Sequence, residues 1–144
     1  MRKAIPIVIT LIVLGFLASI AVPNFLTAMN RSRQKRSMAD MRTIAMAWEA
    51  RATDLKSYSV DSSGHRITVD DLERALAPTY LRKLPRRDGW RYEFELQSAP
   101  DSYVVRSLGS DGRSDGLPYI GATTSFSQDL DFANGTFTQY PEGA

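Results

Sequence analysis

The residues best suited to binding chemistry are four aspartates near the C-terminus, Asp111, Asp115, Asp129 and Asp131. The first two lie among glycines, and the other two follow after a longer insertion. Calcium takes about six to eight oxygen ligands from carboxylates and backbone carbonyls in flexible loops. The spacing does not match an EF-hand loop. Two interpretations stay open: a loop that binds calcium, and a solvated acidic turn in which aspartates cap their own backbone.

The sequence offers little support for catalysis. The chain of 144 residues has no cysteine, which excludes a disulfide scaffold, a thiolate metal site and a cysteine nucleophile. Its one histidine, His65, lies in a polar segment and is expected at the surface. No pocket is implied around Asp129 and Asp131 for acid–base catalysis, and no phosphate-binding loop or dinucleotide fingerprint is present. We therefore predict that the chain is not an enzyme.

The element that precedes these loops is strongly apolar. Residues 4–22 form a run of nineteen residues without a charge, close to the length of about 20 that a helix needs to cross a bilayer. Arg2 and Lys3 precede the run, so the positive-inside rule places the N-terminus in the cytoplasm and the rest of the chain outside. Two interpretations compete: a signal peptide cleaved after Ala21, and a retained helix that anchors the chain or polymerises.

Helical character continues beyond the apolar run, which favours the retained helix. Apolar residues recur at spacings of four and three at Met41, Ala45, Trp48, Ala52 and Leu55. This stripe predicts one helix of roughly 50 residues whose second half packs on a partner surface. Gly15 and Pro23 lie inside it and weaken helix hydrogen bonding, so a kink or an unwound segment is expected between them.

Charge is unevenly distributed along the chain. Residues 1–42 hold seven basic residues and one acidic residue; subtraction from the totals of 18 and 16 leaves a net charge of −4 for residues 43–144. The basic segment contains Arg31, Arg33, Lys35, Arg36 and Arg42. It is interpreted as a solvated helix face, as a patch that attracts anionic lipid headgroups, or as a surface that pairs with acids of a neighbouring subunit. The acidic remainder argues against nucleic-acid binding.

The rest of the chain predicts a small α+β domain. A short helix is expected over residues 71–77, with Asp70 at its start. Apolar and polar residues alternate over 90–97, which predicts a half-buried antiparallel strand, and residues 103–107 should form the returning strand. A short final strand is expected over 136–140. We predict that this small antiparallel sheet packs on the C-terminal half of the long helix.

These patterns divide the chain into three parts. We expect residues 1–23 to form a transmembrane or filament-core helix segment, and residues 24–57 to continue it as an amphipathic helix. Residues 58–144 should form a globular α+β head that includes the acidic loop.

Four short motifs occur in order along the chain. They are AVPNF at 21–25 with Gly15 before it, DMRTI at 40–44, YLRKLP at 80–85 followed by Asp88 and Trp90, and SLGSDG at 107–112. Together they cover most of the chain, and it resembles the type IV pilin and pseudopilin superfamily, most closely the major pseudopilins of type II secretion systems. The resemblance implies a pilin-like fold in which the apolar half of the long helix protrudes. It also implies a structural subunit of a type IV pilus-like filament or a type II secretion pseudopilus.

The resemblance further implies partners and a location. The chain would be held in the bacterial inner membrane with its head in the periplasm, and secretion or pilus machinery would assemble it into a homo-oligomeric helical filament, periplasmic or extracellular. The residues expected in filament contacts are Ile12, Leu14, Gly15, Phe16, Leu17, Pro23 and Phe25. The alternative function is a secreted monomeric binding protein or hydrolase, released by cleavage after Ala21.

The resemblance also implies a metal site. In the related pseudopilins a calcium ion fixes the loop after the second strand, and here the ligands would be the carbonyl of Leu108 and the carboxylates of Asp111, Asp129 and Asp131. The chain departs from the family pattern in several places. The spacer before Asp129 is longer, and Pro6 stands where family members have a glutamate. Arg2 falls where their aromatic first mature residue would be, and the glycine that precedes that residue in the family is missing.

Overall fold

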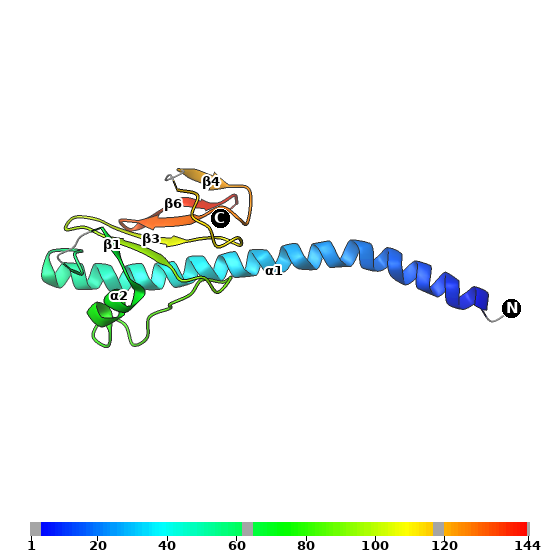
Figure 1. Ribbon diagram of the computed structural model, residues 1–144, viewed down its shortest axis with the longest axis horizontal. Coiled ribbons are helices and arrows are strands. Elements are labelled where there is room, and N and C mark those ends of the chain that lie inside the picture. Colours follow the sequence, from blue (N-terminus) through cyan, green and yellow to red (C-terminus); the bar gives the residue numbers. More distant parts are fainter. Residues whose placement is uncertain (1–3, 62–64, 117–119, 144) are drawn as a thin grey trace. The chain divides into compact units, whose positions relative to one another are not determined.

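A computed structural model describes residues 4–61, 65–116 and 120–143. The chain divides into two compact units, Met1–Ser32 and Arg33–Ala144. Along the chain the elements are α1 (Ala4–Leu55), β1 (Arg66–Ile67), α2 (Val69–Leu76), β2 (Glu95–Ser98), β3 (Tyr103–Ser107), β4 (Gly121–Thr123), β5 (Leu130–Ala133) and β6 (Thr136–Pro141) (Figure 1). The predicted α+β class is confirmed.

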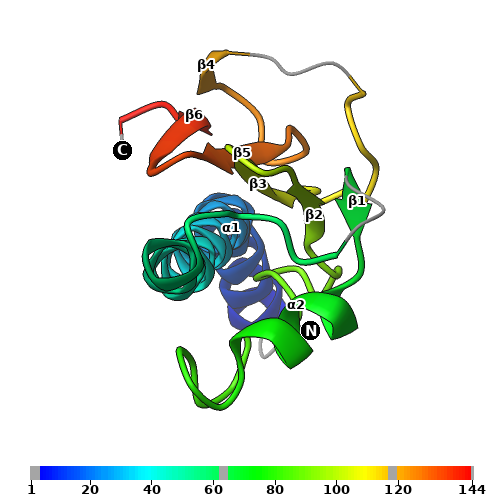
Figure 2. The ribbon, with the colours of Figure 1, turned by 90° about the vertical axis from the view of Figure 1, so that its left-hand side faces the viewer.

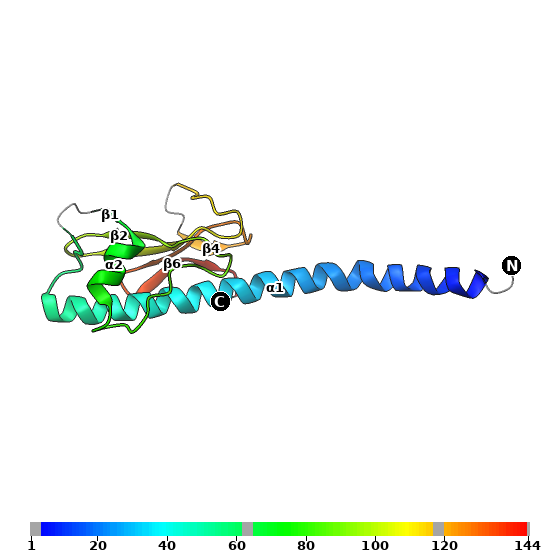
Figure 3. The same cartoon turned by 60° about the horizontal axis from the view of Figure 1, so that its bottom comes forward.

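Helix α1 is longer than any other element. It has 52 residues and includes Pro23, and every described residue from Ala4 to Leu55 is helical. The expected unwound segment between Gly15 and Pro23 is therefore absent. The second half of α1 belongs to the second unit, where the strands lie over it (Figure 3).

The predicted apolar stripe of α1 forms the centre of the core of the second unit. Met41, Ala45, Trp48 and Ala52 are buried, as expected. Leu55 was expected to be buried as the last residue of the stripe, but it is 57% exposed. Helix α1 ends at this residue, and the chain turns away through Lys56, which has a φ of 57°. The stripe packs against buried residues from α2 and the sheet, among them Leu72, Leu76, Leu96, Tyr103, Val105 and Leu130.

Helix α2 begins two residues earlier than predicted. Thr68, not Asp70, is the N-cap: its hydroxyl accepts a hydrogen bond from the backbone N–H of Asp71 at 3.1 Å. The Asp71 carboxylate accepts in return from the backbone N–H of Thr68, also at 3.1 Å. This reciprocal capping box satisfies two donors that the helix start would otherwise leave free.

The sheet has six strands in the order β1-β2-β3-β5-β6-β4. Four of its pairings are antiparallel, but β4 runs parallel to β6, so the prediction of a purely antiparallel sheet is wrong at this edge. Viewed along α1, the sheet covers one side of that helix and α2 lies on the β1–β2 side (Figure 2). Strands β1, β4 and β5 were not expected, because each has at most four residues and alternation cannot be read over so short a run.

The predicted strand over 90–97 is wrong in its first half. Strand β2 starts only at Glu95, although Phe94 and Leu96 are buried as the alternation requires. The buried carboxylate of Asp88 explains the late start. One of its oxygens accepts from the backbone N–H groups of Trp90 and Tyr92, both at 2.9 Å, and holds this segment in a turn. Such an aspartate-centred turn competes with a strand for the same backbone donors.

Gly89 fastens this turn to α1. Its backbone N–H donates to the Ser37 hydroxyl at 2.9 Å, and a Cβ placed on Gly89 would lie 2.1 Å from the carbonyl oxygen of Arg33. A separation of that size is far inside van der Waals contact with rigid backbone. The close approach therefore requires glycine at this position.

We expect the substitution Gly89→Ala to lower the free energy of unfolding by at least about 2 kcal/mol, because the turn must move away from α1. The matched control is Gly15→Ala, where the added methyl group meets nothing within 4 Å. Thermal unfolding of the two full-length variants in the same detergent measures the difference. Equal melting temperatures would contradict the packing assigned to Gly89.

Candidate functional site

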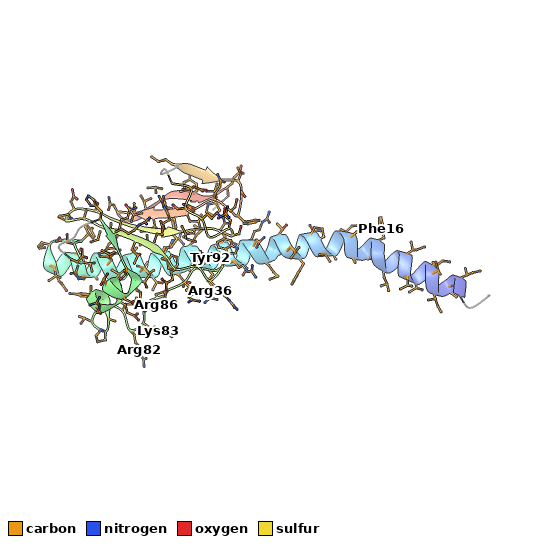
Figure 4. All side chains as sticks on the ribbon, in the orientation of Figure 1. Phe16, Arg36, Arg82, Lys83, Arg86 and Tyr92 are labelled. Atoms are coloured by element: carbon orange, nitrogen blue, oxygen red, sulfur yellow. The ribbon has the colours of Figure 1, made fainter. Side chains whose placement is uncertain are left out.

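The apolar segment, residues 4–29 of α1, exposes its large side chains on all sides. Its fourteen large hydrophobic residues from Ile5 to Leu26 are each between 51% and 68% exposed. Five predicted contact residues are among them, Ile12, Leu14, Phe16, Leu17 and Phe25, and Phe16 projects from the ribbon in Figure 4. By length and composition this helix can cross a membrane, a property that signal sequences share.

A surface helix of a soluble protein has one apolar face and one polar face. The apolar segment has no polar face, so no single neighbour within a small domain would cover it. Burying one such side chain is worth about 1.5–3 kcal/mol. The segment therefore needs surroundings that are apolar on every side, either lipid or several other helices.

The few polar side chains of the apolar segment all form hydrogen bonds within their own helix. Thr10, Ser19, Asn24 and Thr27 each donate a hydrogen bond to a backbone carbonyl three or four residues earlier, at 2.7–3.0 Å. A polar group in hydrocarbon must find its partner within the protein, because no water is present. These bonds suit the three hydroxyl groups to apolar surroundings, whereas the Asn24 amide keeps its carbonyl oxygen and one N–H unpaired among the described residues.

The predicted metal ligands lie in or beside the loops that join β3 to β4 and β4 to β5. Asp131, on β5, is engaged through both carboxylate oxygens: Arg106 of β3 donates to them from Nε at 2.7 Å and from Nη2 at 2.8 Å. Both side chains are less than 10% exposed. In this bidentate pair the guanidinium of Arg106 already compensates the charge of Asp131.

Asp129 is different, because one of its oxygens is unpaired. Its Oδ2 accepts from the backbone N–H of Asp115 at 2.9 Å, and its own N–H donates to Asp115 Oδ2 at 3.0 Å. Its Oδ1 is buried and has no hydrogen-bond partner among the described atoms. Burial raises the pKa of Asp129 to about 6, and the nearby negative charge of Asp115 adds to the rise.

Asp111 has the geometry of the acidic turn that was the alternative to calcium binding. Its carboxylate is exposed and accepts from the backbone N–H of Arg113 at 3.1 Å, so it caps its own turn. Leu108 is half-buried. Within the described residues no three histidine, cysteine or acidic side chains are positioned to hold a metal ion. The predicted set of Leu108, Asp111, Asp129 and Asp131 is not gathered around one point, so calcium binding stays a prediction.

Arg106 is the residue of this region that the sequence reasoning missed. Besides pairing with Asp131, it lies 3.8 Å from Asp129 Oδ2 and donates from Nη1 to the Ser114 hydroxyl at 3.2 Å. It thus links β3, β5 and the loop after β3 through one buried cation. The signal in the sequence was a lone charge in the apolar strand 103–107, which implies a buried partner.

The substitution Asp131→Asn tests this ion pair. It keeps the shape of the side chain but leaves the Arg106 guanidinium buried without its carboxylate, which costs about 3–5 kcal/mol of unfolding free energy. The control Asp101→Asn, at an exposed turn, should stay within about 0.5 kcal/mol of the parent. Urea titration of the full-length chain in detergent measures both. A loss as small as that of the control would show that the pair contributes little.

The raised pKa of Asp129 predicts a pH effect in buffer with a metal chelator. The folded chain binds the proton of Asp129 more tightly than the unfolded chain. The contribution of this carboxyl to the free energy of unfolding is therefore complete below about pH 4 and is lost as the pH rises through about 6. Asp129→Asn lacks this loss. Its stability relative to the parent should therefore improve by up to about 3 kcal/mol from pH 4 to pH 7.

Denaturation at both pH values measures this change. A constant difference between parent and variant would contradict the shift. Repeating the pH 7 titration with excess calcium in place of the chelator tests the metal prediction. Calcium should stabilise the parent and not the variant, and no effect on the parent would argue against the site.

The chain is similar to a known secretion-system protein, whereas no family model and no solved structure matches it significantly. The chain is 27% identical over 124 residues to a protein from Vibrio cholerae serotype O1. The match covers 76% of this chain and 80% of the relative. That protein is named type II secretion system core protein G, so a chain with a long apolar helix and a six-stranded mixed sheet is similar to a core component of a secretion system.

Proposed function

We propose that this chain is a structural subunit of a helical filament, either a type II secretion pseudopilus or a type IV pilus-like fibre, that assembles through its apolar segment. The observation that carries the proposal is that fourteen large apolar side chains on one helix are each more than half exposed. Packing between copies of that helix would bury them. Contacts that repeat head to tail without closing into a ring generate a helical polymer.

The predicted contact residue Gly15 agrees with this role. A side chain at Gly15 would meet nothing within 4 Å, so no contact inside the described chain requires a glycine there. Small residues on apolar helices let neighbouring backbones approach closely. We infer that Gly15 provides such an approach for the helix of another copy, with Phe16 and Leu17 beside it.

The relative from Vibrio cholerae supports the same role, because its name places it in the core of a secretion system. We propose that this chain likewise works with secretion or pilus assembly machinery. Before assembly, the apolar segment would lie in the inner membrane with residues 33–144 in the periplasm. The finished filament would then be periplasmic or extracellular. The proposed role is mechanical and requires no catalysis by this chain.

Charged substitutions in the apolar segment test the proposal. Leu14→Arg or Leu17→Arg should abolish filaments, because a charge buried between apolar helices has no partner. The matched control Leu14→Ile keeps an apolar side chain of the same size and should assemble normally. Electron microscopy of sheared or extracted filaments gives the readout, and unchanged melting of each variant in detergent excludes misfolding. Normal filaments from both arginine variants would contradict the proposal.

Intact mass spectrometry of the mature protein addresses the alternative function. A filament subunit must retain its apolar segment, so the measured mass should include residues 4–21. A mature chain that begins at Val22 would instead support a secreted monomer released by cleavage after Ala21.

A further inference from the structure

Two basic segments that lie far apart in the sequence meet at one place in the second unit. One is the start of its part of α1, with Arg33, Lys35 and Arg36, and the other is the connection from 82 to 91. Gly89 of the connection packs directly on the backbone of Arg33 and donates to Ser37. Figure 4 shows the labelled Arg36, Arg82, Lys83 and Arg86 along the same edge of this unit.

Most of this charge is not neutralised. Arg86 pairs with Asp70 at 2.5 Å and Glu73 at 2.7 Å, and Arg36 lies 3.7 Å from Asp40. The remaining cations are exposed and have no ion pair within the part of the chain that the structure describes. We call these six the basic surface: Arg33, Lys35, Arg82, Lys83, Arg87 and Arg91.

The acid closest in sequence to these cations does not balance them. Asp88 lies between Arg87 and Arg91, but it is only 3% exposed. Its oxygens accept from Trp90, Tyr92 and the Ser107 hydroxyl, and the last of these bonds measures 2.7 Å. The Asp88 carboxylate is therefore used for hydrogen bonds inside the turn and does not pair with the exposed cations. The basic surface presents its charge outward.

We propose that the basic surface binds the anionic headgroups of membrane lipids and so holds the second unit against the bilayer that contains the apolar segment. The inference rests on the membrane location in the proposed function. Lipid is favoured over other anionic partners because no charge occurs from residue 4 to residue 30, and the basic residues begin directly afterwards. In a membrane-spanning helix the first charges after such a run lie at headgroup depth, where anionic lipids attract lysine and arginine.

The chain has no cysteine, so a single label can report the distance from the membrane. The substitution Thr79→Cys places a fluorophore at an exposed position three residues before Arg82. The full-length labelled chain is reconstituted at one copy per vesicle. The vesicles contain phosphatidylcholine with a headgroup-attached quencher, either with or without about 30% phosphatidylglycerol.

Phosphatidylglycerol should increase quenching at least about twofold, and 0.5 M salt should reverse the increase because it screens surface charge. Lys83→Glu with Arg87→Glu should remove the increase. The matched control, Lys56→Glu with Arg113→Glu, changes charge equally at exposed positions outside the basic surface and should retain it.

Equal quenching in the two lipid mixtures would overturn the inference, as would an equal loss in both double variants. At one copy per vesicle, pairing between copies is excluded. Quenching that appears only at high protein density and does not depend on phosphatidylglycerol would also overturn the inference, and would indicate that the basic surface binds an acidic surface on a second copy. Filament formation is scored separately with Leu14→Arg. Failure of the lipid test in a chain that still assembles would therefore leave the proposed function intact.

Discussion

Helix α1 has to satisfy two different surroundings along one continuous element. From residue 38 to residue 52 it buries one face against the sheet and α2, and Trp48 and Met41 are fully inaccessible there. From residue 5 to residue 28 it is predominantly apolar and every residue is exposed within the described chain. The first requirement defines the fold of the second unit, and the second requirement demands lipid or other helices.

The polar interior of the second unit serves mainly to fix connections. Asp88 holds the turn that rests on α1, and Arg106 with Asp131 ties the loop after β3 to the centre of the sheet. Arg106 and Asp131 alternate with the core residues of their own strands, so they lie on the opposite face of the sheet, yet both are buried. A paired buried charge adds little net stability, but removing one partner is costly, so such pairs keep a loop in a single arrangement.

The sequence was sufficient to predict α1, α2, strands β3 and β6 and the α+β class, because each depends on periodicity or on local turn residues. It was insufficient to predict where β2 starts. The alternation over 90–97 does not indicate that the Asp88 carboxylate accepts hydrogen bonds from the backbone N–H groups of Trp90 and Tyr92. It also failed to pair Asp131 with Arg106, which lies 25 residues away on a neighbouring strand. The ligand set was implied by the family resemblance, and local spacing does not reveal a guanidinium that comes from a neighbouring strand.

The hydrogen bonds of Thr10, Ser19, Asn24 and Thr27 have a consequence for movement between environments. Each side chain donates to a carbonyl of its own helix, so these four hydrogen bonds need no headgroup, water molecule or neighbouring subunit. In the proposed pathway from bilayer to filament, the apolar segment would exchange one set of hydrocarbon contacts for another and keep these four hydrogen bonds. Extraction from the membrane would then need little work beyond that of separating apolar surfaces, which the contacts formed in the filament return.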